Sequence, residues 1–457
     1  MERLPADDLL WVYSDDLGSP MDTGALVILE GRSLNDSHGR FLLNSARRSI
    51  EQRLHLVPRF RQVLYRPGFG LGTPLWVDSQ EFDLADHVKT HRLGPSGGEQ
   101  QLLRVCEQLR QRPLDPSKPL WDMWFITGLD GGHVAVFIRL HHAVADGIAG
   151  LAVLAAFLDL DPYQPSPPHQ DWSPAAIPSR SHLLRDNIGR RLAGLKRRLS
   201  HIAHPIRALR GIRAAWPFLH EVFAEPAPRT SLNRRVGPNR KFALIRGSLD
   251  AYRRAADVHG CKVNDVLLSA VGGGLRDLLV NRGESVDDLV LRAMVPISLH
   301  QDDVARANLI SGMAVPIPMG ETDPIRRLEL IAAETAALKK RPRPTLGLIF
   351  RSSIAQKALL RVFRRQRFVN LYVTNLPGPP VPLYLVGEEI LEVFPIVPTA
   401  GNITLGIGAM SYGGQFNVTA TADREHSSDL EVFLRGFQRT LDDLAVPVRV
   451  APSLTVP

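Results

Sequence analysis

The chain has 457 residues, of which 44% are hydrophobic and 22% are charged. This length predicts two or three domains, and the composition is typical of a globular protein, which excludes global disorder. Its two cysteines, Cys106 and Cys261, are too few for a disulfide framework or a cysteine-rich metal site. The N-terminus lacks the apolar core of a secretory signal, and the longest apolar run, 148–158, is shorter than a transmembrane helix. We therefore expect a cytosolic protein that does not span a membrane.

The clearest local signal in the first half is V-A-V-F-I-R-L at 134–140, which is short and rich in β-branched and aromatic residues. It predicts a largely buried strand. The strand leads directly into H-H-A-V-A-D-G at 141–147, and the apolar run 147–160 predicts a helix after it. A polar turn between a strand and a helix is a common place for chemistry in α/β proteins.

A proline-rich break at 161–178 ends this pattern, because neither a helix nor a strand continues through it. We predict an N-terminal domain at 1–165, a crossover at 166–240 and a C-terminal domain at 241–457. In the last of these, Asn264 or Asp265 could cap a helix over 266–279. Candidate strands follow at 289–297, 312–318, 370–376 and 404–412. Strands and helices in both halves predict a two-domain α/β protein.

The crossover carries the excess positive charge. Residues 180–213 contain ten lysines or arginines and one acid, Asp186, in a chain whose formal net charge is +8. Apolar residues recur every three or four positions from 183 to 202, which predicts a basic amphipathic helix. Such a helix is typical of a protein that lies on an anionic membrane. The alternatives are a helix packed on its own domain with a solvated basic face, or cations that bind the phosphates of a ligand; no nucleic-acid-binding module accompanies the charge.

His141 and His142, followed by Asp146 and Gly147, are the residues best suited to chemistry. Neighbouring side chains on an extended strand point to opposite faces, so the two histidines do not chelate one metal easily. One imidazole can instead face a cleft and act as a general base near neutral pH. Asp146 could orient that base or brace the turn, and Gly147 lets a substrate or backbone approach closely. The alternative is that both histidines only satisfy hydrogen bonds in a core turn.

This H-H-A-V-A-D-G segment resembles the HHxxxDG signature of CoA-dependent acyltransferases. Further stretches narrow the resemblance to the bacterial wax ester synthase/diacylglycerol acyltransferase family along the whole chain: P-L-D-P-S-K-P-L-W (113–121), K-V-N-D-V (262–266), V-P-I-S-L (295–299) and T-N-L-P-G-P (374–379). The resemblance implies two chloramphenicol-acetyltransferase-like domains, with the active site at their interface. It also implies no metal and no prosthetic group, with acyl-CoA as the co-substrate.

The same resemblance implies that His142 takes the proton from an acceptor hydroxyl, which then attacks the acyl-CoA thioester. Asp146 more often braces the turn through an arginine in proteins of this kind, and we assign His141 a structural role. Asn264 matches the asparagine of the family's N-D motif, where its amide could assist the base or an oxyanion. The catalytic candidates are therefore His141, His142, Asp146, Gly147 and Asn264.

Two further residues are candidates for substrate binding. Trp121 matches the P-L-W motif, although it is also expected to pack in the core at a strand entry. Asn375 lies in a predicted tight turn near the domain interface, where a structural role is the alternative. The chain also departs from the family: where P-M-H-V-G is usual, Asp22 and Thr23 replace histidine and valine. These changes affect the expected acceptor more than the chemistry.

The predicted function is formation of triacylglycerol from diacylglycerol and long-chain acyl-CoA, with fatty alcohols as further acceptors. The partners are acyl-CoA, diacylglycerol or a fatty alcohol, and an anionic membrane or lipid-droplet surface, with no nucleic acid. We expect a cytoplasmic protein attached peripherally to the inner face of the membrane or to lipid droplets. Two alternatives stay open: acyl transfer to another hydroxylated or amine acceptor, and a lipid-binding paralogue without catalysis.

Overall fold

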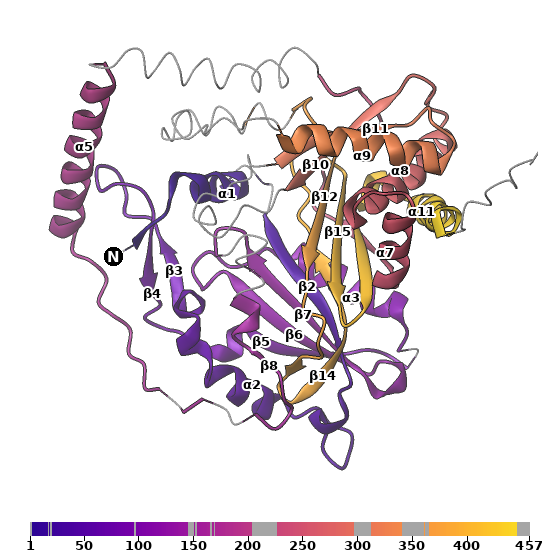
Figure 1. The fold of residues 1–457 in the computed structure, drawn as a ribbon. Helices are drawn as coiled ribbons and strands as arrows, with labels where there is room; N and C mark the ends of the chain where they lie inside the picture. The colour runs from indigo at the N-terminus through magenta and orange to yellow at the C-terminus, as the bar shows by residue number, and fades with distance from the viewer. Residues whose placement is uncertain are drawn as a thin grey trace, which may run out of the picture.

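The structure is a computed structural model that describes residues 2–16, 18, 21–95, 97–144, 150, 153–164, 167–168, 170–202, 226–296, 312–340, 361 and 365–445. Two large β-sheets stand next to each other, and a small sheet lies near the N-terminus (Figure 1). The N-terminal half of the chain forms most of one large sheet, and the C-terminal half forms the other. The small sheet has the order β1-β4-β3, with bounds Glu2–Arg3, Leu75–Asp78 and Gln62–Tyr65.

The first large sheet has seven strands in the order β5-β6-β7-β2-β14-β13-β8. Their bounds are Val88–Arg92, Trp121–Thr127, Val134–His141, Asp22–Leu29, Glu388–Ile396, Tyr384–Leu385 and Leu158–Asp159. Every residue of β7 is buried. Val136 and Ile138 belong to one apolar cluster and Ala135 and Phe137 to another, because successive side chains leave a strand on opposite faces. The sheet is therefore covered on both sides, which explains the uninterrupted apolar character of 134–140.

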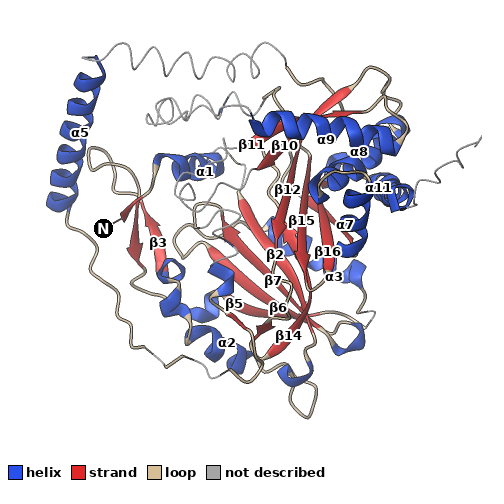
Figure 2. Ribbon diagram, viewed as in Figure 1, coloured by secondary structure: helices blue, strands red, loops and turns tan. Residues whose placement is uncertain are grey.

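The second large sheet has six strands in the order β11-β10-β12-β15-β16-β9. Their bounds are Gly312–Pro318, Val290–Pro296, Leu371–Pro377, Leu405–Tyr412, Gln415–Asp423 and Arg240–Ile245. Helices gather next to this sheet in Figure 2, and the chain supplies them as α7 (Leu249–Val258), α8 (Val263–Asn281), α9 (Pro324–Lys340) and α11 (Leu430–Ala445). A Cβ on Gly273 of α8 would lie 1.9 Å from Thr440 Oγ1 of α11, so glycine at this position allows the two helices to approach closely.

The two halves are joined by a shared sheet. Strand β14 comes late in the chain, yet it pairs with β2 from Ile390↔Leu29 to Ile396↔Gly24. Glu107 of helix α3 (Glu99–Gln111) adds a second link, because its Oε1 accepts a hydrogen bond of 2.9 Å from the backbone N–H of Phe242 in β9. Arg424 pairs with the same carboxylate. Strand pairing and buried polar contacts therefore hold the halves together.

The structure confirms the strands predicted at 134–140, 289–297, 312–318, 370–376 and 404–412, and the helix predicted over 266–279. Part of the helix predicted over 147–160 lies outside the described residues, and Leu158–Asp159 forms strand β8. The predicted basic helix is present as α5 (Arg180–Ile202), although the basic residues beyond 202 lie outside the described part of the chain. The remaining helices of the N-terminal half are α1 (Ala6–Asp16) and α2 (Leu43–Glu51). None of the helices in the described residues combines the length and the apolar character needed to cross a membrane.

Candidate functional site

The two histidines lie where β7, an inner strand of the first sheet, ends. His141 is the last residue of β7, and it pairs in register with Asp22 of β2. The backbone N–H of His142 donates a 3.0 Å hydrogen bond to the carbonyl of Met21. His141 is 1% exposed and His142 is half-buried, so the two rings occupy different environments although they are neighbours in the chain.

The imidazole of His141 is held on both sides. The backbone N–H of Ala143 donates to Nδ1 at 3.1 Å, and Nε2 lies 2.8 Å from Oδ2 of Asp15. Because Nδ1 accepts a hydrogen bond, the proton of the neutral ring is on Nε2, which faces the carboxylate. The buried ring thus has a hydrogen bond at Nδ1 and a carboxylate oxygen beside Nε2, surroundings that suit a structural role for His141.

The imidazole of His142 stacks on the indole of Trp11, with ring centroids 4.1 Å apart and an angle of 16° between the planes. Trp11 and Asp15 are four residues apart in α1, so they lie on the same face of that helix. Helix α1 thus provides one side chain for each histidine. The stacking fixes the plane of the His142 ring and so limits the directions in which its nitrogens point.

Buried charged side chains lie on the strands next to the histidines, and Asp22 is paired in register with His141. Asp22 is 3% exposed, and burial raises the pKa of its carboxyl above the ordinary value, although Arg110 and Arg139 act in the opposite direction. Arg139 Nε donates to Oδ1 of Asp122 at 2.8 Å, and Arg110 Nη1 donates to the backbone carbonyl of Asp22 at 3.1 Å. Burial also lowers the pKa of Arg110 to about 10. These contacts brace strands β2, β6 and β7 at the end that carries the histidines.

The site also contacts the C-terminal half. Ala400, in the loop that follows β14, packs against an apolar cluster that includes Trp11, Met21 and Ala143. Ala143 directly follows His142 in the chain. The candidate base therefore lies close to the seam between the halves.

The other predicted site residues are more widely distributed. Asp146 and Gly147 lie outside the described residues, so their roles remain predictions. Asn264 is half-buried at the second residue of α8, where Asp265 Oδ2 accepts a 3.0 Å hydrogen bond from the backbone N–H of Lys262 and so caps the helix. The first sheet thus carries the histidines, whereas Asn264 belongs to the helical layer of the second.

Trp121 and Asn375 are the two residues predicted to bind substrate. The side chain of Trp121 is 1% exposed, its Nε1–H donates to the carbonyl of Phe60 at 2.9 Å, and its ring stacks on the ring of Phe60. The structure thus places Trp121 in the core of the first half, in the packing position expected at a strand entry and not in contact with solvent. Asn375 is half-buried in β12 opposite Ala409 of β15, so the tight turn predicted at this residue is wrong and a strand takes its place.

Trp11 and Asp15 were not singled out in the sequence, although both contact the histidines. They belong to the segment L-L-W-V-Y-S-D-D at 9–16, which matches none of the motifs that identify the site. The available signal was their spacing of four residues, which places both on one face of a helix. That spacing could not indicate which strand the face would cover.

The chain is similar to known proteins along most of its length. The family model for the wax ester synthase/diacylglycerol acyltransferase catalytic domain matches residues 4–267, and the model for the C-terminal domain of that family matches residues 307–445. A Mycobacterium tuberculosis protein named as a putative diacylglycerol O-acyltransferase is 29% identical over 469 residues, covering 98% of each chain.

Solved structures have the same fold. The wax ester synthase/diacylglycerol acyltransferase from Marinobacter aquaeolei VT8 superimposes with a TM-score of 0.71 at 21% identity, covering 97% of this chain and 98% of that one. The starter condensation domain of rhizomide synthetase, solved in complex with C8-CoA, superimposes with a TM-score of 0.58 at 14% identity, covering 98% and 94%. These likenesses confirm the predicted α/β fold of two chloramphenicol-acetyltransferase-like domains. Because the family model covers more than half of the chain, this protein belongs to the wax ester synthase/diacylglycerol acyltransferase family and is an acyltransferase.

Proposed function

We propose that the protein transfers a long-chain acyl group from acyl-CoA to the free hydroxyl of diacylglycerol and so forms triacylglycerol. A fatty alcohol is the second acceptor that the proposal admits, and its product would be a wax ester. The observation that carries the proposal is the contrast between the two histidines. Nδ1 of His141 accepts a hydrogen bond from the backbone of Ala143 and its buried ring lies beside Asp15, whereas His142 is half-buried, stacked on Trp11 and close to the seam between the halves.

In the proposed reaction His142 is the general base. Its imidazole takes the proton of the acceptor hydroxyl, and the oxygen attacks the thioester carbonyl. The tetrahedral intermediate collapses, the carbon–sulfur bond breaks, and the thiolate of CoA takes the proton from the imidazolium. An ester and free CoA result, and the imidazole returns to its neutral form. This route needs no covalent acyl-enzyme, metal or prosthetic group, and general-base assistance of this kind typically contributes about 10² to 10⁴ in rate.

Two observations support acyl-CoA as the donor. The chain shares its fold with a condensation domain that was solved in complex with C8-CoA, so this architecture can accommodate an acyl-CoA. The family model for the wax ester synthase/diacylglycerol acyltransferase catalytic domain also matches residues 4–267 of this chain. In this proposal Asp146 and Gly147 keep the roles that the HHxxxDG signature implies. The side-chain amide of Asn264 assists the base or the oxyanion, and Asn375 contacts the substrate.

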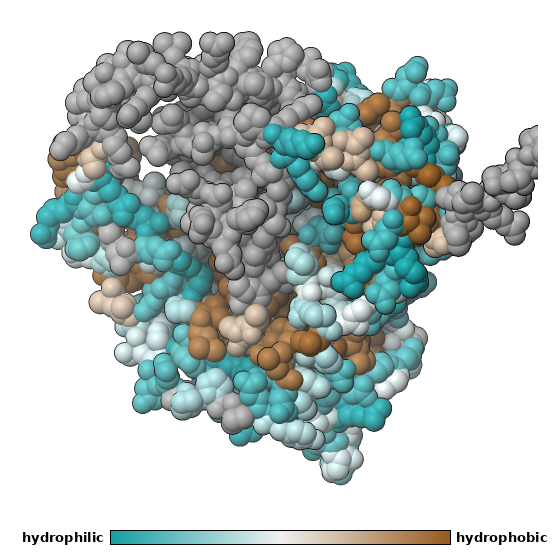
Figure 3. Space-filling view, viewed as in Figure 1, coloured by the Kyte–Doolittle hydropathy of each residue, from teal (hydrophilic) through white to brown (hydrophobic). Residues whose placement is uncertain are grey.

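Helix α5 supports attachment to a lipid surface. Its first turns dock on the small sheet, because Leu183 is fully buried there and Asp186 lies 2.6 Å from Nε of Arg3. Leu184, Ile188 and Leu192 follow at intervals of four residues and remain 45%, 48% and 62% exposed. Apolar and polar side chains lie next to each other on the left of Figure 3, where α5 stands in Figure 1. Such a face favours an anionic membrane or lipid-droplet surface, where the acceptor is found.

Product chromatography tests the proposed function. Purified protein receives radiolabelled palmitoyl-CoA together with equal amounts of diacylglycerol and hexadecanol. Labelled triacylglycerol is the expected main product, and a wax ester as the main product would assign the alcohol as the acceptor. Label that appears in a different ester or an amide would indicate another acceptor on the same scaffold. Binding of the lipids without consumption of thioester would indicate a non-catalytic lipid-binding protein and would contradict the proposal.

A further inference from the structure

A second candidate site lies in a cavity of about 850 Å³ at the surface of the C-terminal half. Its size is within the range of pockets that hold a small molecule or a cofactor. Thirteen residues line it, and six of them are arginines: Arg229, Arg234, Arg235, Arg361, Arg365 and Arg367. None of the lining residues is acidic.

The cavity has a rigid polar floor beneath the arginines. The side-chain amide of Asn370 donates to Asn233 Oδ1 at 2.6 Å, and Gln366 Nε2 donates to Asn402 Oδ1 at 3.1 Å. Asn402 Nδ2 in turn donates to the carbonyl of Gln366 at 2.9 Å. These bonds tie together three segments that are distant in sequence, near 230, 366 and 402. The amides thus bond to one another and to the backbone, which leaves the guanidinium groups as the donors available to a ligand.

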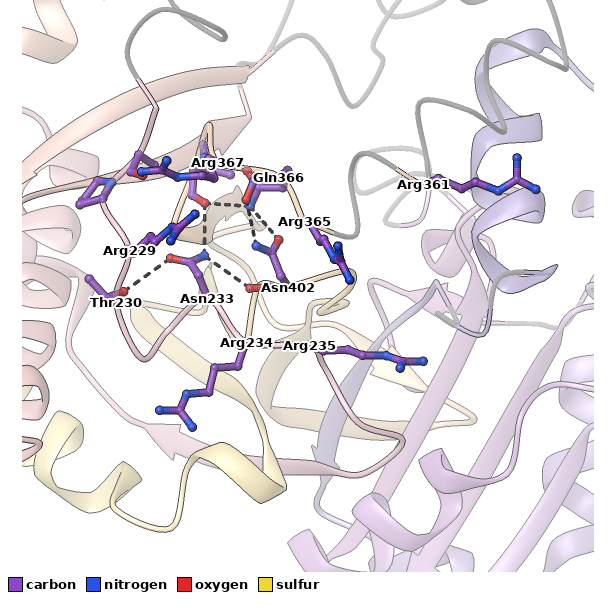
Figure 4. A pocket seen from close by; sticks show the side chains of 13 residues that line it. Arg229, Thr230, Asn233, Arg234, Arg235, Arg361, Arg365, Gln366, Arg367 and Asn402 are labelled. Carbon is purple, nitrogen blue, oxygen red and sulfur yellow. Dashed lines mark hydrogen bonds between the residues drawn. The ribbon is translucent and has the colours of Figure 1, made fainter.

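The arginines of the cavity face solvent and have no acidic partner in the part of the chain that the structure describes. All six are exposed, and within the described residues none of them forms an ion pair with a carboxylate. Figure 4 shows that Arg234 and Arg235 leave the chain in opposite directions, and that Arg235 and Arg365 extend toward the same side. Several unpaired guanidinium groups around one cavity attract an anion, and their planar donors suit the bidentate geometry of phosphate.

The cavity is connected to the histidine site by a short loop. Ala400 packs against the apolar cluster that contains Trp11 and Ala143, and Asn402, two residues further along, lines the cavity. Two residues span at most about 7 Å. A ligand with its phosphates in the cavity could therefore extend a flexible arm along this loop toward His142.

We propose that this arginine-lined cavity binds the phosphate groups of acyl-CoA, so that the pantetheine arm carries the thioester toward the seam. This inference rests on the proposed function, because it assigns a place to the donor of that reaction. The group that the cavity recognises is a phosphate ester. Acyl-CoA carries such groups, and the head group of an anionic phospholipid is the other possible source of one. The donor is favoured because Asn402 of the cavity lies two residues from Ala400, which packs against the apolar cluster that contains Trp11 and Ala143.

The test compares the wild type with the double variant Arg235→Gln/Arg365→Gln. Both side chains are exposed, so the substitutions should leave the unfolding temperature unchanged. Arg254→Gln, an exposed arginine of α7 outside the cavity, is the matched control. Each protein is assayed with palmitoyl-CoA and with palmitoyl-N-acetylcysteamine, a thioester that has no phosphate. Isothermal titration with adenosine 3′,5′-bisphosphate measures binding of the phosphorylated part of CoA directly.

We expect the double variant to raise KM for palmitoyl-CoA about tenfold or more, since hydrogen bonds to charged groups are lost. Its kcat, and the kinetics with the phosphate-free thioester, should stay within about twofold of the wild type. An unchanged KM for palmitoyl-CoA, or an equal loss with both thioesters, would overturn the assignment. If the wild type consumes neither thioester, the proposed reaction fails, and the titration alone decides whether the cavity binds the nucleotide.

Vesicle flotation separates the two phosphate sources. If the cavity binds the donor, the wild type and the double variant float equally well with phosphatidylglycerol vesicles. Loss of flotation in the variant with an unchanged KM for palmitoyl-CoA would assign the cavity to a lipid head group and would contradict the proposal.

Discussion

The histidine pair shows how two identical neighbouring side chains acquire different chemistry. His141 ends strand β7 and faces Asp15, and the backbone N–H of Ala143 occupies its second nitrogen. His142 lies one residue beyond the strand, where its ring meets Trp11 instead. Each ring therefore meets a different side chain of α1.

The first prediction concerns His142. Replacement by alanine should lower turnover about 10² to 10⁴-fold, because the acceptor hydroxyl loses its proton acceptor. The fold should remain intact, since the ring is only half-buried and the backbone bond to Met21 does not involve the side chain. Turnover of palmitoyl-CoA and the unfolding temperature are measured together, with the exposed His38→Ala as the control. Turnover within a few-fold of the wild type would reject His142 as the base.

The second prediction concerns Asp22. Burial raises the pKa of its carboxyl above 3.8, so the folded protein binds the proton more tightly than the unfolded chain does. The contribution of this tighter proton binding to the free energy of unfolding is fully present below pH 3.8. It is lost as the pH rises through the pKa of Asp22 in the folded protein. In Asp22→Asn this pH dependence should disappear. The free energy of unfolding of the wild type should therefore fall relative to that of the variant, by up to about 1.4 kcal/mol per pH unit in that window.

Urea unfolding at several pH values from 4 upward measures this difference. Asp257→Asn, an exposed aspartate at the end of α7, serves as the control for a change of charge. A difference between the wild type and Asp22→Asn that is constant over the range would show that the Asp22 carboxyl has the same pKa in both states.

At the scale of single elements, helices α1 and α5 combine packing with function. In α1, Trp11 and Asp15 lie one turn apart, and each contacts one histidine. In α5, Leu183 is buried on the small sheet, whereas the face with Leu184 and Ile188 is left uncovered. Helical periodicity alone predicts that such faces exist. What each face contacts is determined by neighbours that are distant in sequence.

The third prediction concerns the exposed face of α5. Serine at 184, 188 and 192 together should reduce binding to anionic vesicles by about tenfold or more, because three exposed apolar side chains lose their contact with lipid. Turnover of a soluble short-chain acceptor should stay unchanged, since these side chains are exposed on α5 whereas the histidines lie at the end of β7. Flotation with phosphatidylglycerol vesicles at moderate salt measures the effect, and Leu56→Ser, an exposed leucine elsewhere, is the control. Equal flotation of the two variants would show that α5 does not bind lipid.

At the scale of the whole molecule, the two halves form one structure through contacts that cross between them. Strand β14 pairs with β2, and Glu107 accepts from the Phe242 backbone while it pairs with Arg424. The loop after β14 carries Ala400 to the histidine cluster and Asn402 to the arginine-lined cavity. The relative position of both sites therefore depends on this junction.

The fourth prediction concerns that junction. Glu107→Ala leaves the Phe242 N–H without its acceptor and Arg424 without its partner, which should lower the free energy of unfolding by about 1 to 3 kcal/mol. Glu107→Gln retains an acceptor for Phe242 and should cost less. Chemical unfolding followed by tryptophan fluorescence measures both variants, and the exposed Glu81→Ala is the control. If Glu107→Ala were as stable as Glu81→Ala, the carboxylate would not contribute to the junction.

Much of the local structure could be predicted from the sequence, because the period of apolar residues is a property of neighbouring positions. Strand β7, helix α8 and helix α5 appear where their patterns predicted them. The segment H-H-A-V-A-D-G and its accompanying motifs also identified the family, because they stand in the family's order along the chain. Trp121 shows the limit of a motif, since its match could not distinguish substrate contact from the buried packing observed.

The sequence by itself determined the chemistry that is available: an imidazole at a strand end, an acyltransferase signature and a basic amphipathic helix. Only the tertiary structure decided which side chains meet. It brought Trp11 and Asp15 to the histidines, inserted β14 beside β2, and gathered arginines from two separate segments around one cavity. The physical reason is that periodicity is local, whereas contacts between distant segments depend on how whole sheets and helices bury their apolar faces together.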